Sequence, residues 1–212
     1  MSEMNVHEKV QWVYQSKNNQ DLAERYDAWS AEYEHDLEDL SGYVGPQRTV
    51  EVLTQYLPYT AKILDAGVGT GLVGKALHAQ GFTHLEGIDL SEGMLKKAAE
   101  KGIYQALYRR VMGDPLGFLD NSYDGIISVG VFTYGHAPSK TFEELIRITK
   151  PDGYIIFPLR PEFYESSDFK TKMLDLEVSG KWQLVSQSNK IQPLPQLSPE
   201  LDYQIWVYQV NK

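Results

Sequence analysis

A carboxylate followed by three alternating glycines is the pattern with the clearest chemistry in the chain. Asp65 lies near the end of the apolar run 62–67, and Gly67, Gly69 and Gly71 follow at every second position before a helical pattern begins. Glycine lets a backbone turn tightly and approach a ligand closely, and a helix N-terminus presents free N–H groups. The spacing predicts a ligand site between a strand and a helix, suited to a carboxylate or phosphate at the helix start.

Two classes of cofactor fit this loop. Residues 69–74 match the dinucleotide pattern G-x-G-x-x-G, and Asp89 lies twenty residues after Gly69, where that pattern places a ribose-binding acid. However, a strand that ends in Asp65 would place a carboxylate against the pyrophosphate and repel it. The same carboxylate complements the ammonium group of S-adenosylmethionine, whose carboxylate suits the helix N-terminus and whose ribose suits Asp89.

The elements around this loop alternate as a doubly wound sheet requires. Helical periods at 71–80, 92–100 and 140–150 separate short apolar runs, which predict strands at 62–67, 84–90, 104–111, 123–132 and 153–159. Apolar runs without alternation are typical of strands covered on both faces. The segments 181–190 and 201–210 predict an antiparallel pair at the sheet edge. The expected fold is α/β: a Rossmann-like, doubly wound, mostly parallel seven-stranded sheet with an antiparallel C-terminal hairpin and an N-terminal helical cap.

We expect one domain over residues 1–212, made of a helical cap or lid (1–60), a cofactor-binding core (61–160) and a C-terminal helix and hairpin (161–212). In the cap, the periodicity predicts a first helix from Val6 to about residues 18–19 and a third from Pro46 to about residue 57. Between them Tyr26, Trp29 and Tyr33 recur at helical spacing, which favours the buried stripe of a second amphipathic helix.

The ordered motifs over residues 22–160 resemble those of class I S-adenosylmethionine-dependent methyltransferases. Residues 65–71 (D-x-G-x-G-x-G) are similar to the first motif of that family and residues 87–95 (GIDLSEGML) to the second. The resemblance implies methyl transfer from S-adenosylmethionine, with Asp89 on the ribose hydroxyls, Met94 beside the adenine, Asp114 near the adenine amino group and Tyr43 near the methionine part. The full set of implied cofactor-binding residues is Tyr43, Asp65, Gly67, Gly69, Thr70, Asp89, Leu90, Met94, Asp114 and Gly130.

Three further segments resemble a subgroup, the methyltransferase-like group named for the Williams–Beuren syndrome region. They are YDAWSAEYEHD (26–36), Y-x-x-P (43–46) and GHAP (135–138). The chain departs from the family pattern in two places: the segment 114–124 is shorter, and Asp152 replaces the first glycine of a Pro-Gly-Gly turn. Aspartate tolerates a left-handed backbone, so we expect that turn to form. Ser91 has the type and position of an N-cap for the helix at 92–100.

His136 is the candidate catalytic residue. It follows the predicted strand 123–132, and strand ends of an open α/β sheet border the ligand crevice. Histidine accepts protons near neutral pH, so His136 is a candidate base for a substrate hydroxyl or amine, the alternative being a loop histidine that anchors backbone. The other four histidines read as surface positions. The chain has no cysteine, no histidine pair with metal-ligand spacing and no G-x-S-x-G, so no metal site and no thiol or serine hydrolase is expected.

Charge and hydropathy limit the partners. Twenty basic and 29 acidic residues give a net charge of −9, and residues 1–60 contain eleven acids and four bases. This balance disfavours nucleic acid and anionic membranes and weakly favours a small neutral or cationic acceptor. No apolar run predicts a signal peptide or a membrane span, so we expect a cytoplasmic protein, a monomer or weak dimer. Two alternatives remain: an NAD-dependent oxidoreductase and a non-catalytic S-adenosylmethionine-binding protein.

Overall fold

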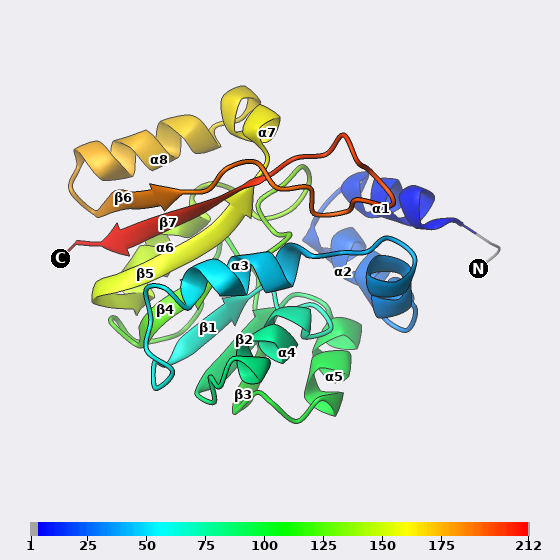
Figure 1. Ribbon diagram of the computed structural model, residues 1–212, viewed down its shortest axis with the longest axis horizontal. Helices are drawn as coiled ribbons and strands as arrows, with labels where there is room; N and C mark the ends of the chain where they lie inside the picture. The colour runs from blue at the N-terminus through cyan, green and yellow to red at the C-terminus, as the bar shows by residue number, and fades with distance from the viewer. Residues whose placement is uncertain (1–3, 212) are drawn as a thin grey trace.

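Seven strands form one sheet in a computed structural model, which describes residues 4–211 (Figure 1). The sheet order is β3-β2-β1-β4-β5-β7-β6, in which β1 to β5 run parallel and β7 pairs antiparallel with both β5 and β6. The strands are β1 (Ile63–Ala66), β2 (Leu85–Asp89), β3 (Ala106–Arg109), β4 (Tyr123–Ile127), β5 (Thr149–Leu159), β6 (Trp182–Gln187) and β7 (Gln204–Val210). The predicted fold class is confirmed, with β6 as the outer strand of the hairpin.

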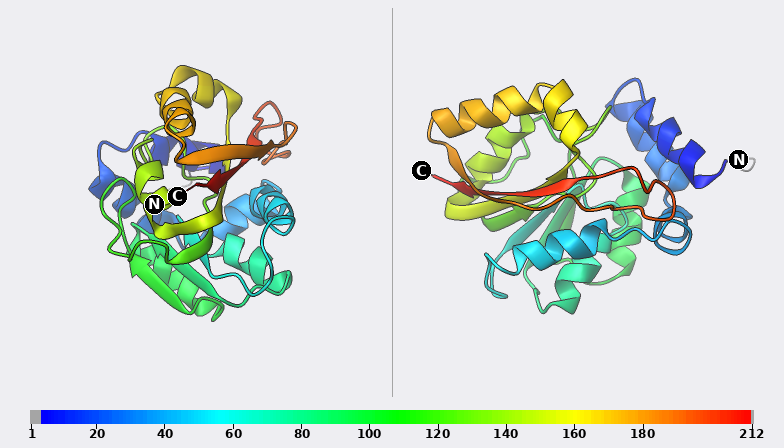
Figure 2. Two further views of the ribbon diagram at one scale, coloured as in Figure 1. Left: turned by 90° about the vertical axis from the view of Figure 1, so that its left-hand side faces the viewer. Right: turned by 45° about the horizontal axis from the view of Figure 1, so that its top comes forward.

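Helices cover both faces of the sheet, as its unalternating apolar strands require. Seen nearly edge-on, the sheet lies between α6 (Thr141–Ile148) and α8 (Phe169–Val178) on one face and α3 (Gly45–Leu53) and α4 (Leu72–Ala79) on the other (Figure 2). Helix α5 (Glu92–Glu100) packs beside β2 and β3, and α7 (Pro161–Ser166) precedes α8. The longest helix among residues 4–211 has eleven residues, and none is long and apolar enough to cross a bilayer.

The N-terminal cap lies at the end of the sheet where the parallel strands finish (Figure 1). It consists of α1 (Val6–Tyr14), α2 (Asn19–Trp29) and a π-helical turn, η1 (His35–Asp39). Helix α1 ends earlier than predicted because Asn18 is the N-cap of α2 and accepts a hydrogen bond from the Asp21 N–H. Helix α2 also ends early, so Tyr33 lies beyond it. Helix α3 likewise ends at Leu53, four residues before the predicted end.

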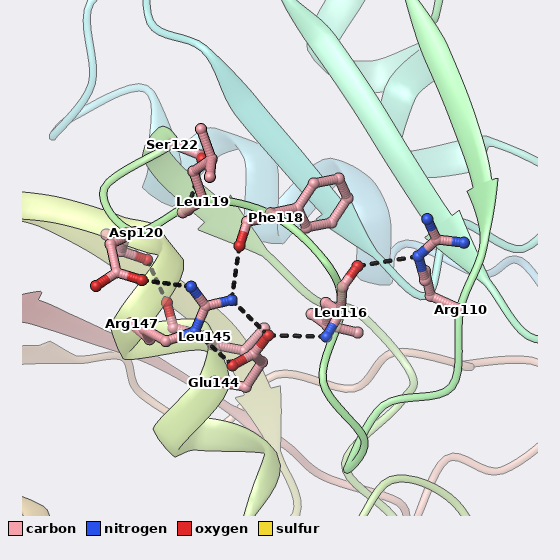
Figure 3. Close-up of polar contacts among 10 residues, drawn as sticks. Arg110, Leu116, Phe118, Leu119, Asp120, Ser122, Glu144, Leu145 and Arg147 are labelled. Atoms are coloured by element: carbon pink, nitrogen blue, oxygen red, sulfur yellow. Dashed lines mark hydrogen bonds and ion pairs between the residues drawn. The ribbon is translucent and has the colours of Figure 1, made fainter.

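No helix fills the connection from β3 to β4, residues 110–122, and a polar network fastens it instead (Figure 3). The Arg147 guanidinium on α6 donates to the Phe118 carbonyl oxygen at 2.8 Å and to Glu144 at 2.7 Å. Glu144 accepts the Leu116 N–H at 2.8 Å, and the Leu116 carbonyl accepts from Arg110 Nε at 2.9 Å. These bonds hold the connection against α6, which fixes the backbone that follows β3.

The core beneath α6 predicts that two leucine-to-alanine substitutions will differ greatly in their effect on stability. Leu145 on α6 is fully buried, whereas Leu119 is 82% exposed. Leu145→Ala should lower the free energy of unfolding by about 3 kcal/mol, because it loses apolar burial and leaves a cavity. Leu119→Ala, the matched control, should stay within about 0.5 kcal/mol of the unaltered protein. Urea unfolding followed by circular dichroism measures both, and equal losses would contradict the assigned core.

Candidate functional site

A cavity lies where the carboxyl ends of β1, β2 and β4 meet the cap. In this sheet β2 and β4 flank β1, so the cavity lies at the topological switch point, where ligands bind in open α/β sheets. Seven of the predicted site residues line it: Gly67, Gly69, Asp89, Leu90, Met94, Gly130 and His136. Residues that the sequence did not assign to the site complete the lining: Asn19, Leu22, Tyr26, Tyr33, Arg110, Val111, Met112, Val129, Val131 and Ala137.

The glycine loop lies tightly against its neighbours. The N–H groups of Gly67 and Val68 both donate to the Ile88 carbonyl oxygen at 2.9 Å, which anchors the loop to β2. Gly67 has φ 90°, and a Cβ there would lie 2.2 Å from Val131 Cγ2. Any other residue at this position would therefore strain the backbone and collide with the chain after β4.

Asp89 is the side chain that joins the two loops of the site. Its Oδ2 accepts the Gly69 N–H at 2.8 Å, and its Oδ1 accepts the Ser91 N–H at 2.9 Å. Burial raises the pKa of the carboxyl, and these N–H groups act in the opposite direction. Ser91 caps α5 as predicted, through a 3.0 Å bond from the Met94 N–H to its hydroxyl. Since a carboxylate has about four acceptor positions, Asp89 keeps capacity for hydroxyl groups at the cavity wall.

Asp65 is buried beside the loop, outside the cavity lining. The Tyr104 hydroxyl donates to its Oδ2 at 2.6 Å and accepts the Gly74 N–H at 3.0 Å. A Cβ on Gly74 would lie 2.2 Å from the Tyr104 oxygen, so only glycine admits this tyrosine. Contact with Tyr104 thus explains why position 74, the third glycine of the dinucleotide-like pattern, is a glycine. Sequence analysis missed Tyr104, because nothing local to residue 104 marks a contact with residues 65 and 74.

Two buried oxygens near the glycine loop have unused hydrogen-bonding capacity. Asp65 Oδ1 and Thr70 Oγ1 make no hydrogen bond to any residue within 4–211. Buried polar atoms in folded proteins are nearly always paired, so such atoms point to a polar ligand or water. Beside Gly69 the space that a Cβ would occupy is open. A carboxylate, a hydroxyl and an open glycine turn at the start of α4 fit a small molecule that carries both an ammonium and a carboxylate group.

The cap closes the cavity through a tyrosine–histidine pair. The Tyr26 hydroxyl lies 2.7 Å from His136 Nε2, and His136 Nδ1 lies 2.8 Å from the Tyr134 carbonyl oxygen. Because a carbonyl only accepts, Nδ1 carries the proton, and Nε2 accepts from Tyr26. Burial lowers the pKa of His136, which favours this neutral form. Of the predicted aromatic stripe, Trp29 is buried, and Tyr26 and Tyr33 pack against it while they also line the cavity.

A second contact docks the cap on α5. Asp27 Oδ1 on α2 accepts the Gly93 N–H at 2.7 Å and the Ser91 hydroxyl at 2.5 Å. A carboxylate at a helix N-terminus is favoured by the free N–H groups and by the helix dipole. Sequence analysis did not predict this contact, because Asp27 and α5 are far apart along the chain.

Four predicted site residues lie outside the lining of this cavity: Asp65 and Thr70, which are buried beside the glycine loop, and Asp114 and Tyr43. Asp114 is exposed, and the preceding Val111 and Met112 line the cavity in its place. Tyr43 lies next to Gly130, where its hydroxyl oxygen would be 3.6 Å from an added Cβ, and it lines an adjoining cavity. The turn at Asp152 forms as expected, with φ 62°.

Comparison with known proteins now assigns the family. A model of the methyltransferase domain matches residues 64–157. The chain is 38% identical to human methyltransferase-like protein 27 over 176 residues, which cover 77% of this chain and 70% of that protein. The chain belongs to the class I methyltransferase family.

Solved structures of the same fold agree with this assignment. The methyltransferase-family chain matches an S-adenosylmethionine-dependent methyltransferase of Thermotoga maritima, described as a possible histamine N-methyltransferase, with a TM-score of 0.64 and 18% identity over 88% of this chain and 98% of the other. It matches the [4+2]-cyclase SpnF with a TM-score of 0.71 and 14% identity over 92% and 96%. These likenesses show the fold, and the second shows that the fold alone does not fix the reaction.

The buried Asp65 carboxyl predicts a pH-dependent stability. Burial raises its pKa to about 7, an effect that the Tyr104 bond partly offsets. Because the folded-state pKa is above the unfolded value, the folded protein binds this proton more tightly, and stability falls as pH rises from about 4 to about 7. The free energy of unfolding of Asp65→Asn, relative to that of the unaltered protein, should increase by roughly 2.5 kcal/mol between pH 5 and pH 8. Urea unfolding at both pH values measures this gain, and a pH-independent difference would contradict the shift.

The neutral state of His136 is also measurable. Its lowered pKa and its bond to Tyr134 predict an Nδ1–H tautomer with Nε2 unprotonated at pH 7. Nitrogen-15 NMR of the labelled imidazole distinguishes the tautomers directly. Titration of His136 should begin only at a pH below the ordinary histidine pKa of about 6.5. Protonation of Nε2 at pH 7 would show that Tyr26 does not donate to it.

Proposed function

We propose that this protein binds S-adenosylmethionine in the cavity at the carboxyl end of the sheet and transfers the methyl group to a small-molecule acceptor. The observation that carries the proposal is Asp89, held by Gly69 and Ser91 at the cavity wall. The unpartnered oxygens of Asp65 and Thr70 beside the same loop support it, because they suit the amino-acid end of that cofactor.

The residues of the site divide by the part of the cofactor that they would hold. We assign the ribose hydroxyls to Asp89 and the adenine to an apolar pocket formed by Leu90, Met94, Val111 and Met112, all of which line the cavity. Asp65 and Thr70 would hold the ammonium and carboxylate groups.

When bound, the cofactor supplies a methyl group already activated by the positive charge on sulfur. The chain then has to align the acceptor and exclude water, which is the work of the cap. The aromatic faces of Tyr26 and Tyr33 would also stabilise a positive charge in the cavity. His136 does not meet an acceptor directly, because Tyr26 occupies its Nε2. We therefore assign proton removal to the pair: the Tyr26 oxygen takes the acceptor's proton as the Tyr26 proton passes to His136.

We further assign the protein to the methyltransferase-like group named for the Williams–Beuren syndrome region. The segments that carry that resemblance meet in space: Tyr26 and Asp27 come from YDAWSAEYEHD, and His136 comes from GHAP. These residues make the contacts between cap and core, so the shared motifs correspond to the closure of the cavity.

Loss of the Asp89 carboxylate tests the cofactor site. Asp89→Ala should weaken the binding of S-adenosylhomocysteine at least tenfold, because it removes charged hydrogen bonds to the ligand and the bond that holds the glycine loop. Asp114→Ala, which removes an exposed acid outside the cavity, should stay within about twofold of the unaltered protein. Titration calorimetry measures the affinities, and circular dichroism shows that each variant folds.

Thermal shifts with three ligands separate the proposal from its alternatives. S-adenosylmethionine and S-adenosylhomocysteine should raise the melting temperature and NAD should not, because only a ligand of the folded state stabilises it. A shift with NAD alone would move the assignment to hydride transfer. Binding without transfer of labelled methyl groups to any of a broad acceptor panel would instead indicate a cofactor-binding protein without the reaction.

A further inference from the structure

A second cavity adjoins the proposed cofactor site. Gly130 lines both cavities, and Tyr43 lies at the same point, its hydroxyl oxygen 3.6 Å from where a Cβ on Gly130 would lie. The walls come from five parts of the chain that are distant in sequence: Tyr14 at the end of α1, Tyr43 before α3, 130–133 after β4, 158–160 at the end of β5, and 193–203 before β7. A molecule in this cavity would reach the cofactor site at Gly130.

The lining is mostly apolar and carries one charge. Aromatic, proline and leucine side chains dominate it: Tyr14, Tyr43, Phe132, Pro158, Leu159, Pro193, Leu194, Leu201 and Tyr203. Among the described residues that line the cavity, Arg160 alone has a formal charge. Arg160 pairs with Glu162 through Nε at 2.8 Å, but Glu162 is 53% exposed and does not line the cavity. Such an exposed pair is weak, so Arg160 remains available to a carboxylate.

Three hydroxyl groups of this cavity, those of Thr133, Tyr43 and Tyr203, make no hydrogen bond to the described part of the chain. Thr133 is 8% exposed, and its Oγ1 makes no hydrogen bond within residues 4–211. The Tyr43 hydroxyl also makes none to the described part of the chain, and burial raises its pKa, so that it stays protonated and able to donate. A buried hydroxyl without a partner is costly unless a ligand or water satisfies it. Thr133 thus points to a polar atom on whatever fills the cavity.

We propose that this second cavity is the acceptor site and that it takes a small hydrophobic carboxylic acid. The acid group pairs with Arg160, the hydrocarbon part lies among the apolar walls, and the atom to be methylated lies at Gly130, away from the acid. There its lone pair forms the bond to the methyl carbon while the carbon–sulfur bond breaks with its electrons staying on sulfur. An O–H or N–H acceptor then loses its proton through Tyr26 to His136. This inference rests on the proposed function.

The charge beside the cavity favours an anionic acceptor, although the net charge of the protein is negative. The acids of the cap are largely paired: Lys9 binds Glu32 and Asp36, Lys75 binds Glu38, and Lys101 binds Glu34. At the scale of one cavity a nearby guanidinium outweighs distant, screened carboxylates. The weak preference for a neutral or cationic acceptor, drawn from composition, therefore gives way to an anionic one.

Binding of simple acids tests the proposal. Saturation-transfer NMR titrations use 3-phenylpropionate, indole-3-acetate and octanoate, each beside its primary amide, with the full chain saturated by S-adenosylhomocysteine. At least one acid should bind about tenfold more tightly than its amide, and Arg160→Met should remove that preference. Lys170→Met is the matched control, since it removes one positive charge from another exposed pair outside the cavity. It should leave acid binding unchanged.

A second variant tests the place of binding without altering charge. Leu201→Trp fills the cavity from its loop side and should abolish acid binding while S-adenosylhomocysteine binds as before. Absence of binding by all three acids, equal binding of acids and amides, or indifference to both Arg160→Met and Leu201→Trp would overturn the proposal. Failure of S-adenosylhomocysteine to bind the unaltered protein is a separate result, which would overturn the proposed function and this inference with it.

Discussion

The carboxylate of Asp89 is the interaction on which the geometry of the site depends. Asp89 bridges the backbone of the glycine loop after β1 and the turn before α5, so two neighbouring crossovers are joined at the edge of the sheet. Without that bridge the N–H groups of Gly69 and Ser91 would need water, and the turns that carry them would no longer share one geometry. The cavity, the start of α5 and the docking of the cap on α5 all follow from this position. The position itself follows from the parallel register of β1 and β2.

Sequence analysis found what is encoded locally. The strand–glycine–helix pattern, the Ser91 cap and the Asp152 turn each depend on a few consecutive residues, and the structure contains all three. The doubly wound sheet and its antiparallel hairpin followed from the apolar runs and from the family resemblance. In contrast, Tyr104 and Asp27 were missed because each acts on residues far away in sequence. Asp114 shows the opposite case, because it matches the family motif in sequence but is exposed in the structure. It lies in a connection that is shorter than in the family and that is hydrogen-bonded to Arg147.

The site separates two electrostatic environments. Next to the glycine loop the groups with free capacity are acidic or hydroxylic, and burial of Asp65 makes its negative charge costly until a cation approaches. Beyond Gly130 the formal charge on the lining is positive. A cofactor with an ammonium group and an acceptor with a carboxylate would each be attracted to its own side. Net charge describes neither side, because it averages over the whole surface and several acids of the cap are paired with lysines.

With the proposed cofactor bound, the contact of Asp27 with α5 would couple cap opening to ribose release. Ser91 donates its hydroxyl to Asp27 and its backbone N–H to Asp89, so the residue that fastens the cap also orients the acid proposed to bind the ribose. Movement of α2 away from the core would leave the first turn of α5 without its carboxylate and loosen the Asp89 side chain at the same time. The movement of α2 that would admit an acceptor would therefore also weaken the binding of the proposed cofactor after transfer. The order in which the products leave would then depend on the mobility of this one helix.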